Sequence, residues 1–128
     1  MKKILVIEDE EDYQHLIGQV LQAGGFEIFS AYDGAEGLEK IKKELPDIVI
    51  LDINLPSMSG WDVLRNVRNF PDKNIGDIPV IMLTVRREDE DQIKGLDSGA
   101  DDYVAKPFIP KELILRINAV LKRAGGAK

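Results

Sequence analysis

The sequence predicts an α/β fold with a doubly wound, five-stranded parallel sheet covered by helices on both faces. Short apolar segments of strand length recur along the 128 residues, and amphipathic helical patterns separate them. Alternation of strand and helix is typical of βαβ units with right-handed crossovers, which build a sheet of this kind. The length matches one domain, which we place at residues 1–123, with 124–128 as a flexible tail or the start of a linker.

Five segments are expected to form the strands. Three of them are apolar throughout, namely Ile4–Ile7, Ile48–Leu51 and Val80–Leu83. Continuous apolar strands are typical of a parallel sheet that is buried on both faces. The alternating segment Phe26–Ala31 and the weaker segment Tyr103–Ala105 complete the sheet.

Two helices are expected in the N-terminal half. The first ends at Gly24, and its apolar stripe with helical spacing contains Tyr13, Leu16, Ile17, Val20 and Leu21. Asp33 and Glu36 have the spacing of a capping box and begin the second helix, which ends at Pro46. The residues expected on its inward side are Leu38, Ile41 and Leu45.

Three more helices are expected in the C-terminal half. Ser59 begins one that ends before Pro71, and Pro110 occupies the first position of the last helix. Their core-facing residues are Leu64 and Val67 in the former and Leu113, Ile117, Val120 and Leu121 in the latter. Between these helices, Arg86–Asp97 has few large apolar residues, so we expect the most mobile helix there.

The composition excludes several classes of protein. There is no cysteine, which excludes disulfides and cysteine-ligated zinc. The net charge of −6 disfavours direct binding of nucleic acid. No apolar run approaches the roughly 20 residues that span a bilayer, and acids directly follow the first apolar stretch, so no signal peptide is expected. These features indicate a cytoplasmic protein that does not enter a membrane.

The most informative polar residues directly follow the predicted strands. Glu8 and Asp9 come after the first strand, Asp52 after the third, Thr84 after the fourth and Lys106 after the fifth. Ligands of open α/β sheets bind at the carboxyl ends of the strands. Neighbouring carboxylates repel one another unless a cation joins them, and an oxygen-only ligand set is typical of Mg²⁺. We therefore expect a magnesium site at this edge of the sheet.

Asp52 is the expected nucleophile of this site. Beside a metal ion, its carboxylate can take up a phosphoryl group and form an acyl phosphate. Lys106 is expected to stabilise the transferring group. The hydroxyl of Thr84 is expected to donate a hydrogen bond to the product.

Four segments of the chain resemble the receiver domain of response regulators in two-component signalling, within the CheY-like superfamily. They are ILVIEDE, LDINLPSMSGWDVL, PVIMLT and GADDYVAKPF, and the similarity covers residues 2–123. The resemblance implies a flavodoxin-like fold with strand order 2-1-3-4-5 and five helices. It also implies a switch that catalyses only its own phosphorylation and dephosphorylation, not a turnover enzyme. The C-terminal part is most similar to receivers of the OmpR/PhoB-like subfamily.

The resemblance assigns roles to the metal site and the phosphoacceptor. It implies that Asp9 binds Mg²⁺ directly and that Glu8 acts largely through water. Asp52 is implied to be both a metal ligand and the phosphorylated residue. The backbone carbonyl of Asn54 is implied to complete the metal site.

The resemblance also implies how the phosphoryl group is sensed. Thr84 matches the switch hydroxyl, Lys106 the phosphate-binding lysine, and Tyr103 an aromatic residue that swings inward on activation. A purely structural role as a half-buried strand residue is the alternative for Tyr103. The bond between Lys106 and Pro107 is implied to be cis. Phosphorylation is implied to switch the face formed by the fourth helix, the last strand and the last helix.

The lifetime of the phosphorylated state is expected to depend on three positions around the site. Val85 stands where alanine or glycine is commoner in the family, and Arg86 follows it. Asn54 lies across the site from both. Because these side chains border the path of a hydrolytic water, we expect them to tune the dephosphorylation rate.

The partners implied by the resemblance are a sensor histidine kinase or phosphotransfer protein as donor and an effector protein or domain as recipient of the signal. Small acyl phosphates are implied as alternative donors. A phosphorylation-dependent homodimer is also implied, although Gln92 stands where the subfamily has a base. The charged positions of that dimer correspond to Asp101, Asp102, Glu112 and Arg116. His15 is expected to be an exposed helix residue, and the sharper alternative, which the resemblance suggests, places it on the kinase-docking side of the first helix.

Two other functions stay open from the residues alone. One is a haloacid-dehalogenase-like phosphotransferase that uses Asp52-Ile53-Asn54, although that chemistry usually needs an acid where Asn54 stands. The other is a protein-interaction module that is never phosphorylated, against which the full set of site residues argues.

Overall fold

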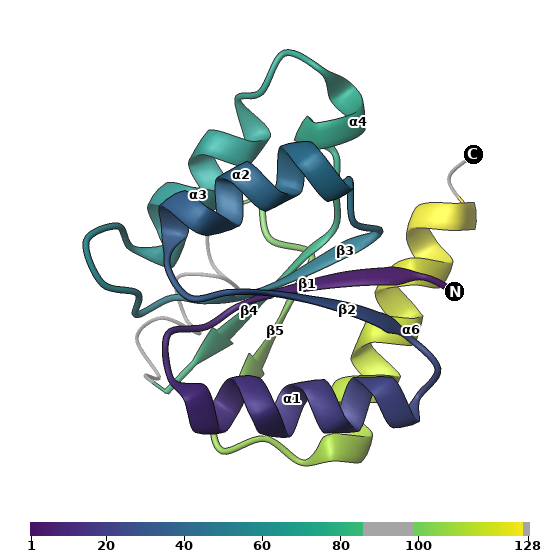
Figure 1. Ribbon diagram of the computed structural model, residues 1–128. Helices are drawn as coiled ribbons and strands as arrows, with labels where there is room; N and C mark the ends of the chain where they lie inside the picture. The colour runs from purple at the N-terminus through teal and green to yellow at the C-terminus, as the bar shows by residue number, and fades with distance from the viewer. Residues whose placement is uncertain (86–98, 127–128) are drawn as a thin grey trace.

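A single parallel sheet forms the middle of three layers (Figure 1). The computed structural model describes residues 1–85 and 99–126. All neighbouring strands are parallel, and their order is β2-β1-β3-β4-β5. The strands are β1 (Lys3–Ile7), β2 (Glu27–Ala31), β3 (Ile48–Asp52), β4 (Val80–Thr84) and β5 (Asp102–Ala105). The predicted fold class and strand order are therefore confirmed.

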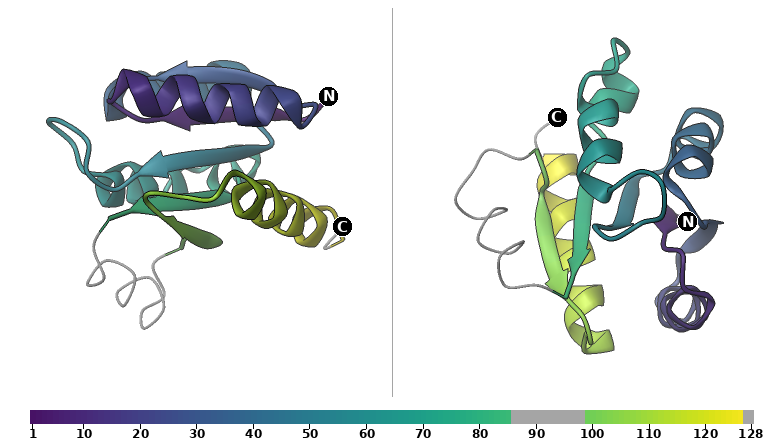
Figure 2. Two further views of the ribbon diagram at one scale, coloured as in Figure 1. Left: turned by 90° about the horizontal axis from the view of Figure 1, so that it is seen from below. Right: turned by 90° about the vertical axis from the view of Figure 1, so that its left-hand side faces the viewer.

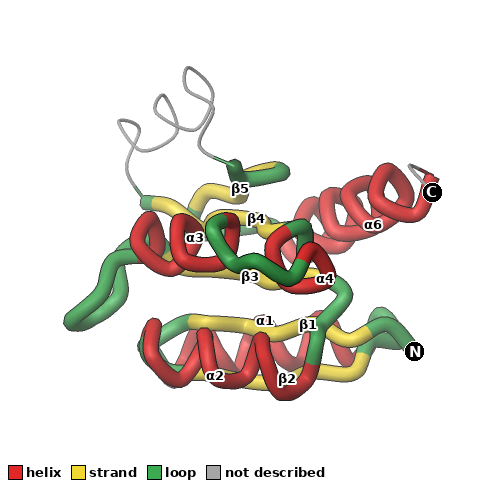
Figure 3. The backbone as a smooth tube through the Cα atoms, turned by 90° about the horizontal axis from the view of Figure 1, so that it is seen from above, coloured by secondary structure: helices red, strands yellow, loops and turns green. Residues whose placement is uncertain are grey.

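Helices cover both faces of this sheet. On one face lie α2 (Gly34–Glu44), α3 (Gly60–Arg68) and the short α4 (Lys73–Gly76) (Figure 3). On the other face lie α1 (Glu11–Ala23) and α6 (Pro110–Gly126) (Figure 2). None of the described helices is long and apolar enough to cross a membrane.

Two apolar cores hold the layers together, one on each face of the sheet. In β1, Leu5 and Ile7 point into the core under α2 and α3, while Ile4 and Val6 point into the core under α1 and α6. Successive side chains of a strand point to opposite faces. The inner strands therefore need apolar residues at every position, which is why they lack polar alternation.

Three predicted helix starts are confirmed. The side chain of Asp33 accepts a hydrogen bond from the backbone N of Glu36 at 2.8 Å, and Ser59 accepts one from the N of Asp62 at 3.2 Å. Pro110 is the first residue of α6. The four-residue α4 was not predicted, because so short a helix has no apolar stripe to reveal it.

Three details differ from the predictions. Leu16 is 41% exposed, because α1 buries Gln14, Ile17 and Leu21 instead. Leu45 is exposed as well, since it follows α2 in the left-handed conformation (φ 48°) and its side chain leaves the inward face. Helix α6 extends to Gly126, beyond the boundary expected at residue 123. The helix predicted at residues 86–97 lies outside the described residues.

Candidate functional site

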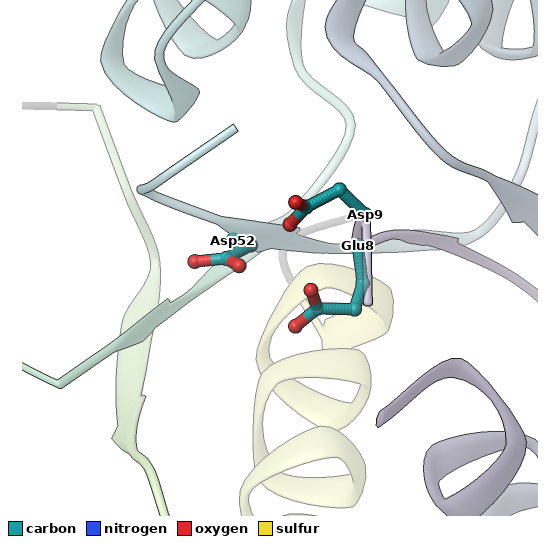
Figure 4. Close-up of side chains that lie close together, drawn as sticks. All are labelled: Glu8, Asp9 and Asp52. Atoms are coloured by element: carbon teal, nitrogen blue, oxygen red, sulfur yellow. The ribbon is translucent and has the colours of Figure 1, made fainter. Parts of the chain in front are cut away.

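Three carboxylates meet where β1 and β3 end. Glu8 and Asp9 directly follow β1, and Asp52 is the last residue of β3. One oxygen of each lies within 4.8 Å of the others, and Figure 4 shows the three groups gathered around one small space. Glu8 and Asp52 are buried, whereas Asp9 is exposed. The site is therefore open to solvent on the side of Asp9.

Lys106 brings one positive charge to these acids. It follows β5 directly, and its backbone N donates to the carbonyl of Thr84 at 2.7 Å. Its ammonium Nζ donates to Oε1 of Glu8 and, at 3.0 Å, to Oδ2 of Asp52. The side chain of Lys106 is only 4% exposed. One buried ammonium thus serves two buried carboxylates.

Backbone amides orient the two buried acids. Oδ1 of Asp52 accepts a hydrogen bond from the backbone N of Asn54 at 3.0 Å. Oε2 of Glu8 accepts one from the backbone N of Glu10 at 3.0 Å. Each acid is therefore held by its own loop on one oxygen and by Lys106 on the other.

Burial changes the proton affinities of this cluster. The pKa of Glu8 is raised to about 7, mainly because burial desolvates its carboxylate; the hydrogen bonds from Lys106 and the Glu10 backbone lower it in part, and the charge of Asp52 raises it. Burial alone would lower the pKa of Lys106, but its bonds to Glu8 and Asp52 outweigh this and raise it. The ammonium therefore stays charged, while the carboxylates carry more negative charge than it neutralises.

Most of the other predicted residues lie near this edge of the sheet. Thr84 ends β4 and is fully buried. Val85 and Asn54 are exposed beside the site. The bond between Lys106 and Pro107 is cis, as the resemblance implies. Arg86 lies outside the described residues, so its expected position is not part of this geometry.

Tyr103 lies in β5 and is half-buried. It packs against the core under α2 and α3, and the Arg116 guanidinium lies 5.8 Å from the centre of its ring. These contacts agree with the structural alternative and do not test the predicted switch.

The charged residues of the predicted dimer face have partners within the chain. Arg116 binds both carboxylate oxygens of Asp102, at 3.0 and 3.1 Å, and also Glu112 at 3.1 Å. Asp101 pairs with Arg68 at 3.1 Å. On the other predicted surface, His15 is exposed on α1, as expected.

Gln14 supports the site and was not recognised from the sequence. Its Nε2 donates to the carbonyls of Val6 at 2.9 Å, Glu8 at 3.1 Å and Ala31 at 2.8 Å. This buried amide ties the loop that carries Glu8 to both β1 and β2. Gln14 precedes Ile17 by three residues and Leu21 by seven, and this helical spacing is the sequence signal that could have placed it on the buried face of α1.

Gly60 also supports the site and was not recognised. A Cβ atom at this position would lie 2.3 Å from the carbonyl oxygen of Asp52. Its backbone N donates to the carbonyl of Ile53 at 2.8 Å. Only glycine therefore lets the start of α3 approach the backbone of the predicted phosphoacceptor.

The family of the chain follows from comparison with known proteins. The sequence profile of the response regulator receiver domain matches residues 4–118. The chain belongs to this family. Receiver domains of this kind act in two-component systems, where they partner with histidine kinases and effectors and generally use Mg²⁺ for phosphorylation.

Curated relatives support the subfamily. Over 122 residues this receiver domain is 41% identical to the phosphate regulon transcriptional regulatory protein PhoB of Escherichia coli (strain K12), covering 95% of this chain and 52% of that protein. It is also 41% identical over 123 residues to the alkaline phosphatase synthesis transcriptional regulatory protein PhoP of Bacillus subtilis (strain 168), covering 96% and 50%. The chain spans about half the length of these relatives.

Solved structures share the fold. A CheY-like response regulator receiver domain protein from Methanospirillum hungatei JF-1 superposes with a TM-score of 0.89 at 30% identity, covering 100% of this chain and 99% of that one. The receiver domain of the Francisella response regulator 1452 superposes with a TM-score of 0.85 at 34% identity, covering 97% and 99%. The receiver domain thus matches whole domains of known structure.

Proposed function

We propose that this receiver domain accepts a phosphoryl group on Asp52. The observation that carries the proposal is the gathering of three carboxylates within 4.8 Å of one another, two of which share one buried ammonium. The metal ligands we assign are Glu8, Asp9, Asp52 and the backbone carbonyl of Asn54. Such an oxygen-only set fits Mg²⁺, which keeps several waters beside one or two carboxylates.

The reaction begins with an oxygen of Asp52. That oxygen forms a bond to the phosphorus of a phosphohistidine or a small acyl phosphate, and the bond from phosphorus to the donor breaks. The donor leaves with the bonding electron pair, and the histidine takes up a proton in its place. Bound Mg²⁺ supplies neutralisation of the carboxylates and orientation of the transferring group.

Lys106 and Thr84 are the residues that we assign to the phosphorylated state. The ammonium of Lys106 pairs with the new phosphoryl oxygens, and the Thr84 hydroxyl donates to them. A hydrogen bond to a charged group contributes about 1.5–3 kcal/mol, whereas reversing a 1:99 equilibrium needs about 5.5 kcal/mol. Both residues are therefore needed for the switch, and Tyr103 is assigned to turn inward with them.

The proposed chemistry is limited to the domain itself. We assign only self-phosphorylation and self-dephosphorylation, with Asn54, Val85 and Arg86 tuning the lifetime. Asn54 also argues against the haloacid-dehalogenase-like alternative, which usually needs an acid at its position. The full set of site residues argues against an interaction module that is never phosphorylated.

The partners that we propose are a sensor histidine kinase or phosphotransfer protein and a downstream effector protein or domain. PhoB and PhoP are named as transcriptional regulators, so control of transcription is a proposal for a longer protein that would contain this domain. A phosphorylation-dependent homodimer through the face of β5 and α6 would require Arg116 to exchange its partners within the chain for partners across the interface. Location in the cytoplasm stays a prediction.

Intact-mass measurement tests the proposal. The protein is incubated with acetyl phosphate, with and without Mg²⁺, beside Asp52→Asn as the matched control. We expect the mass of one phosphoryl group on the unaltered chain only with Mg²⁺, and none on Asp52→Asn. Equal labelling of Asp52→Asn would overturn the assignment. Multiple turnover of a phosphoester would favour the phosphotransferase instead.

A further inference from the structure

We propose that Tyr13 is a positioning residue that keeps the ammonium of Lys106 in the site when metal takes its carboxylate partners. The proposal rests on the function assigned to Asp52 above. It concerns a side chain of α1 that the apolar stripe of the sequence predicted to be simply part of the core.

The ring of Tyr13 lies against the charged end of Lys106. Nζ of Lys106 is 4.3 Å from the centre of the ring. A cation within about 6 Å of the face of an aromatic ring is attracted by its electrons, and more strongly where water is excluded. The Lys106 side chain is almost fully buried, so this contact falls in the stronger class.

Three acids are also neighbours of the ammonium. Glu8 and Asp52 accept hydrogen bonds from Nζ, and an oxygen of Glu10 lies 4.0 Å away. Glu8 and Asp52 are also assigned to the metal. Cation and ammonium therefore compete for the same oxygens.

Tyr13 lies outside this competition. Its ring is neutral and its face offers no oxygen to a hard cation such as Mg²⁺. When Glu8 and Asp52 turn toward the metal, the ring still attracts the ammonium. Lys106 then remains within reach of an incoming phosphoryl group instead of swinging into solvent.

A second aromatic residue holds the ring in place. The centres of the Tyr13 and Phe108 rings are 6.3 Å apart at an interplanar angle of 40°. Phe108 follows Lys106 by two residues, so this pair joins α1 to the loop that carries the lysine. Such tilted aromatic pairs add stability beyond the area that they bury.

Nuclear magnetic resonance tests the position directly. A ring facing Nζ shifts the ε-methylene protons of Lys106 upfield, and we expect this shift with and without saturating Mg²⁺. Tyr13→Phe keeps the shift and Tyr13→Leu abolishes it. Absence of the shift, or its loss when Mg²⁺ is added, would overturn the proposal whether or not Asp52 is phosphorylated.

The phosphorylation rate tests the consequence. With saturating Mg²⁺ and acetyl phosphate, we expect Tyr13→Leu to slow labelling of Asp52 about tenfold, a loss within the range of a buried cation–π contact. Tyr13→Phe should restore the rate, and Tyr13→Leu should leave the Mg²⁺ dissociation constant unchanged by calorimetry.

A double-mutant cycle separates positioning from packing. In a Lys106→Met background, Tyr13→Leu should have no further effect on the labelling rate, because the cation is already gone. The same loss in both backgrounds would mean that Tyr13 only packs, and would overturn the proposal. If the unaltered chain is not labelled at all, the function proposed for Asp52 fails, while the resonance measurement still decides the role of Tyr13.

Discussion

Two clusters of charged side chains lie in different parts of this domain, one buried and one partly exposed. In the cluster at Asp52, one ammonium binds two of the three clustered carboxylates. In the other, the Arg68 guanidinium at the end of α3 pairs with Asp101 at 3.1 Å and donates to three carbonyls. These carbonyls belong to Gly99 at 2.9 Å, Gly76 at 3.0 Å and Ile78 at 2.7 Å.

The difference separates a structural cluster from a functional one. Asp101 also accepts a hydrogen bond from the backbone N of Val80 at 2.8 Å, so the Arg68 cluster joins α3 to the starts of β4 and β5. Burial lowers the pKa of Arg68, and the charges of Asp101 and Asp77, both exposed, oppose this. The site, in contrast, holds surplus negative charge on buried carboxylates. Surplus buried charge destabilises a fold and indicates that a ligand normally compensates it.

Loss of Arg68 should have the largest effect on stability. Arg68→Ala removes the donor of three backbone carbonyls and the counter-charge of Asp101, so we expect the free energy of unfolding to fall by about 3 kcal/mol in urea denaturation. Arg65→Ala is the matched control on the same helix, because that side chain is 64% exposed and its ion pair within the described residues is the one with Asp62. An equal loss for both variants would contradict a structural role for the Arg68 cluster.

The stability of the site, in contrast, should rise when its surplus negative charge is compensated. Folded Glu8 has a pKa of about 7 against 4.5 as its ordinary value, so the folded state binds its proton more tightly than the unfolded state. The metal-free protein should therefore lose stability as the pH rises from about 4.5 to 7, by about 2 kcal/mol. Thermal denaturation across this range measures the loss.

Glu8→Gln and Mg²⁺ sharpen this prediction. The variant cannot ionise at position 8, so most of the loss should vanish. In the unaltered chain, Mg²⁺ should restore more stability at pH about 8 than at pH about 6, because it competes with the proton on Glu8. Equal stabilisation by Mg²⁺ at both values would contradict the raised pKa of Glu8.

Backbone packing under the site gives the next prediction. Gly60→Ala places a methyl group against the backbone of Asp52, and we expect a loss of about 2 kcal/mol together with slower phosphorylation. Gly18→Ala is the control, because a Cβ atom there meets nothing within 4 Å and should stabilise α1 by about 1 kcal/mol. Urea denaturation measures both, and a neutral Gly60→Ala would refute the close packing of α3 on Asp52.

The smallest expected effects differ in sign between the clusters. Without metal at pH about 8, Asp52→Asn should stabilise the domain by about 1 kcal/mol, since it relieves repulsion among the carboxylates. Asp101→Asn should destabilise it by about 1 kcal/mol, since Arg68 loses its counter-charge. Melting temperatures of the two variants, measured side by side, test this prediction. A change of the same sign in both would contradict a functional role for one cluster and a structural role for the other.

The sequence predicted the acids of the site better than their supports. Glu8, Asp9 and Asp52 directly follow apolar strands, and parallel strands bring their carboxyl ends to one edge. Gln14 and Gly60 act through single contacts with backbone carbonyls, which no periodic pattern encodes. Leu16 was assigned to the core for a related reason, because helical spacing alone did not decide between Leu16 and Gln14 for the buried face of α1.

By itself, the sequence determined which segments become strands, in what layers they lie and which polar residues gather at the carboxyl edge. These features follow from periodicity and chain order, which are local properties. Only the tertiary structure decided that Lys106 binds Glu8 and Asp52 at once, that Tyr13 faces the ammonium, and that Arg68 joins α3 to Gly99 and Asp101. Such contacts join side chains that lie far apart in the sequence, so their geometry exists only after the layers have packed.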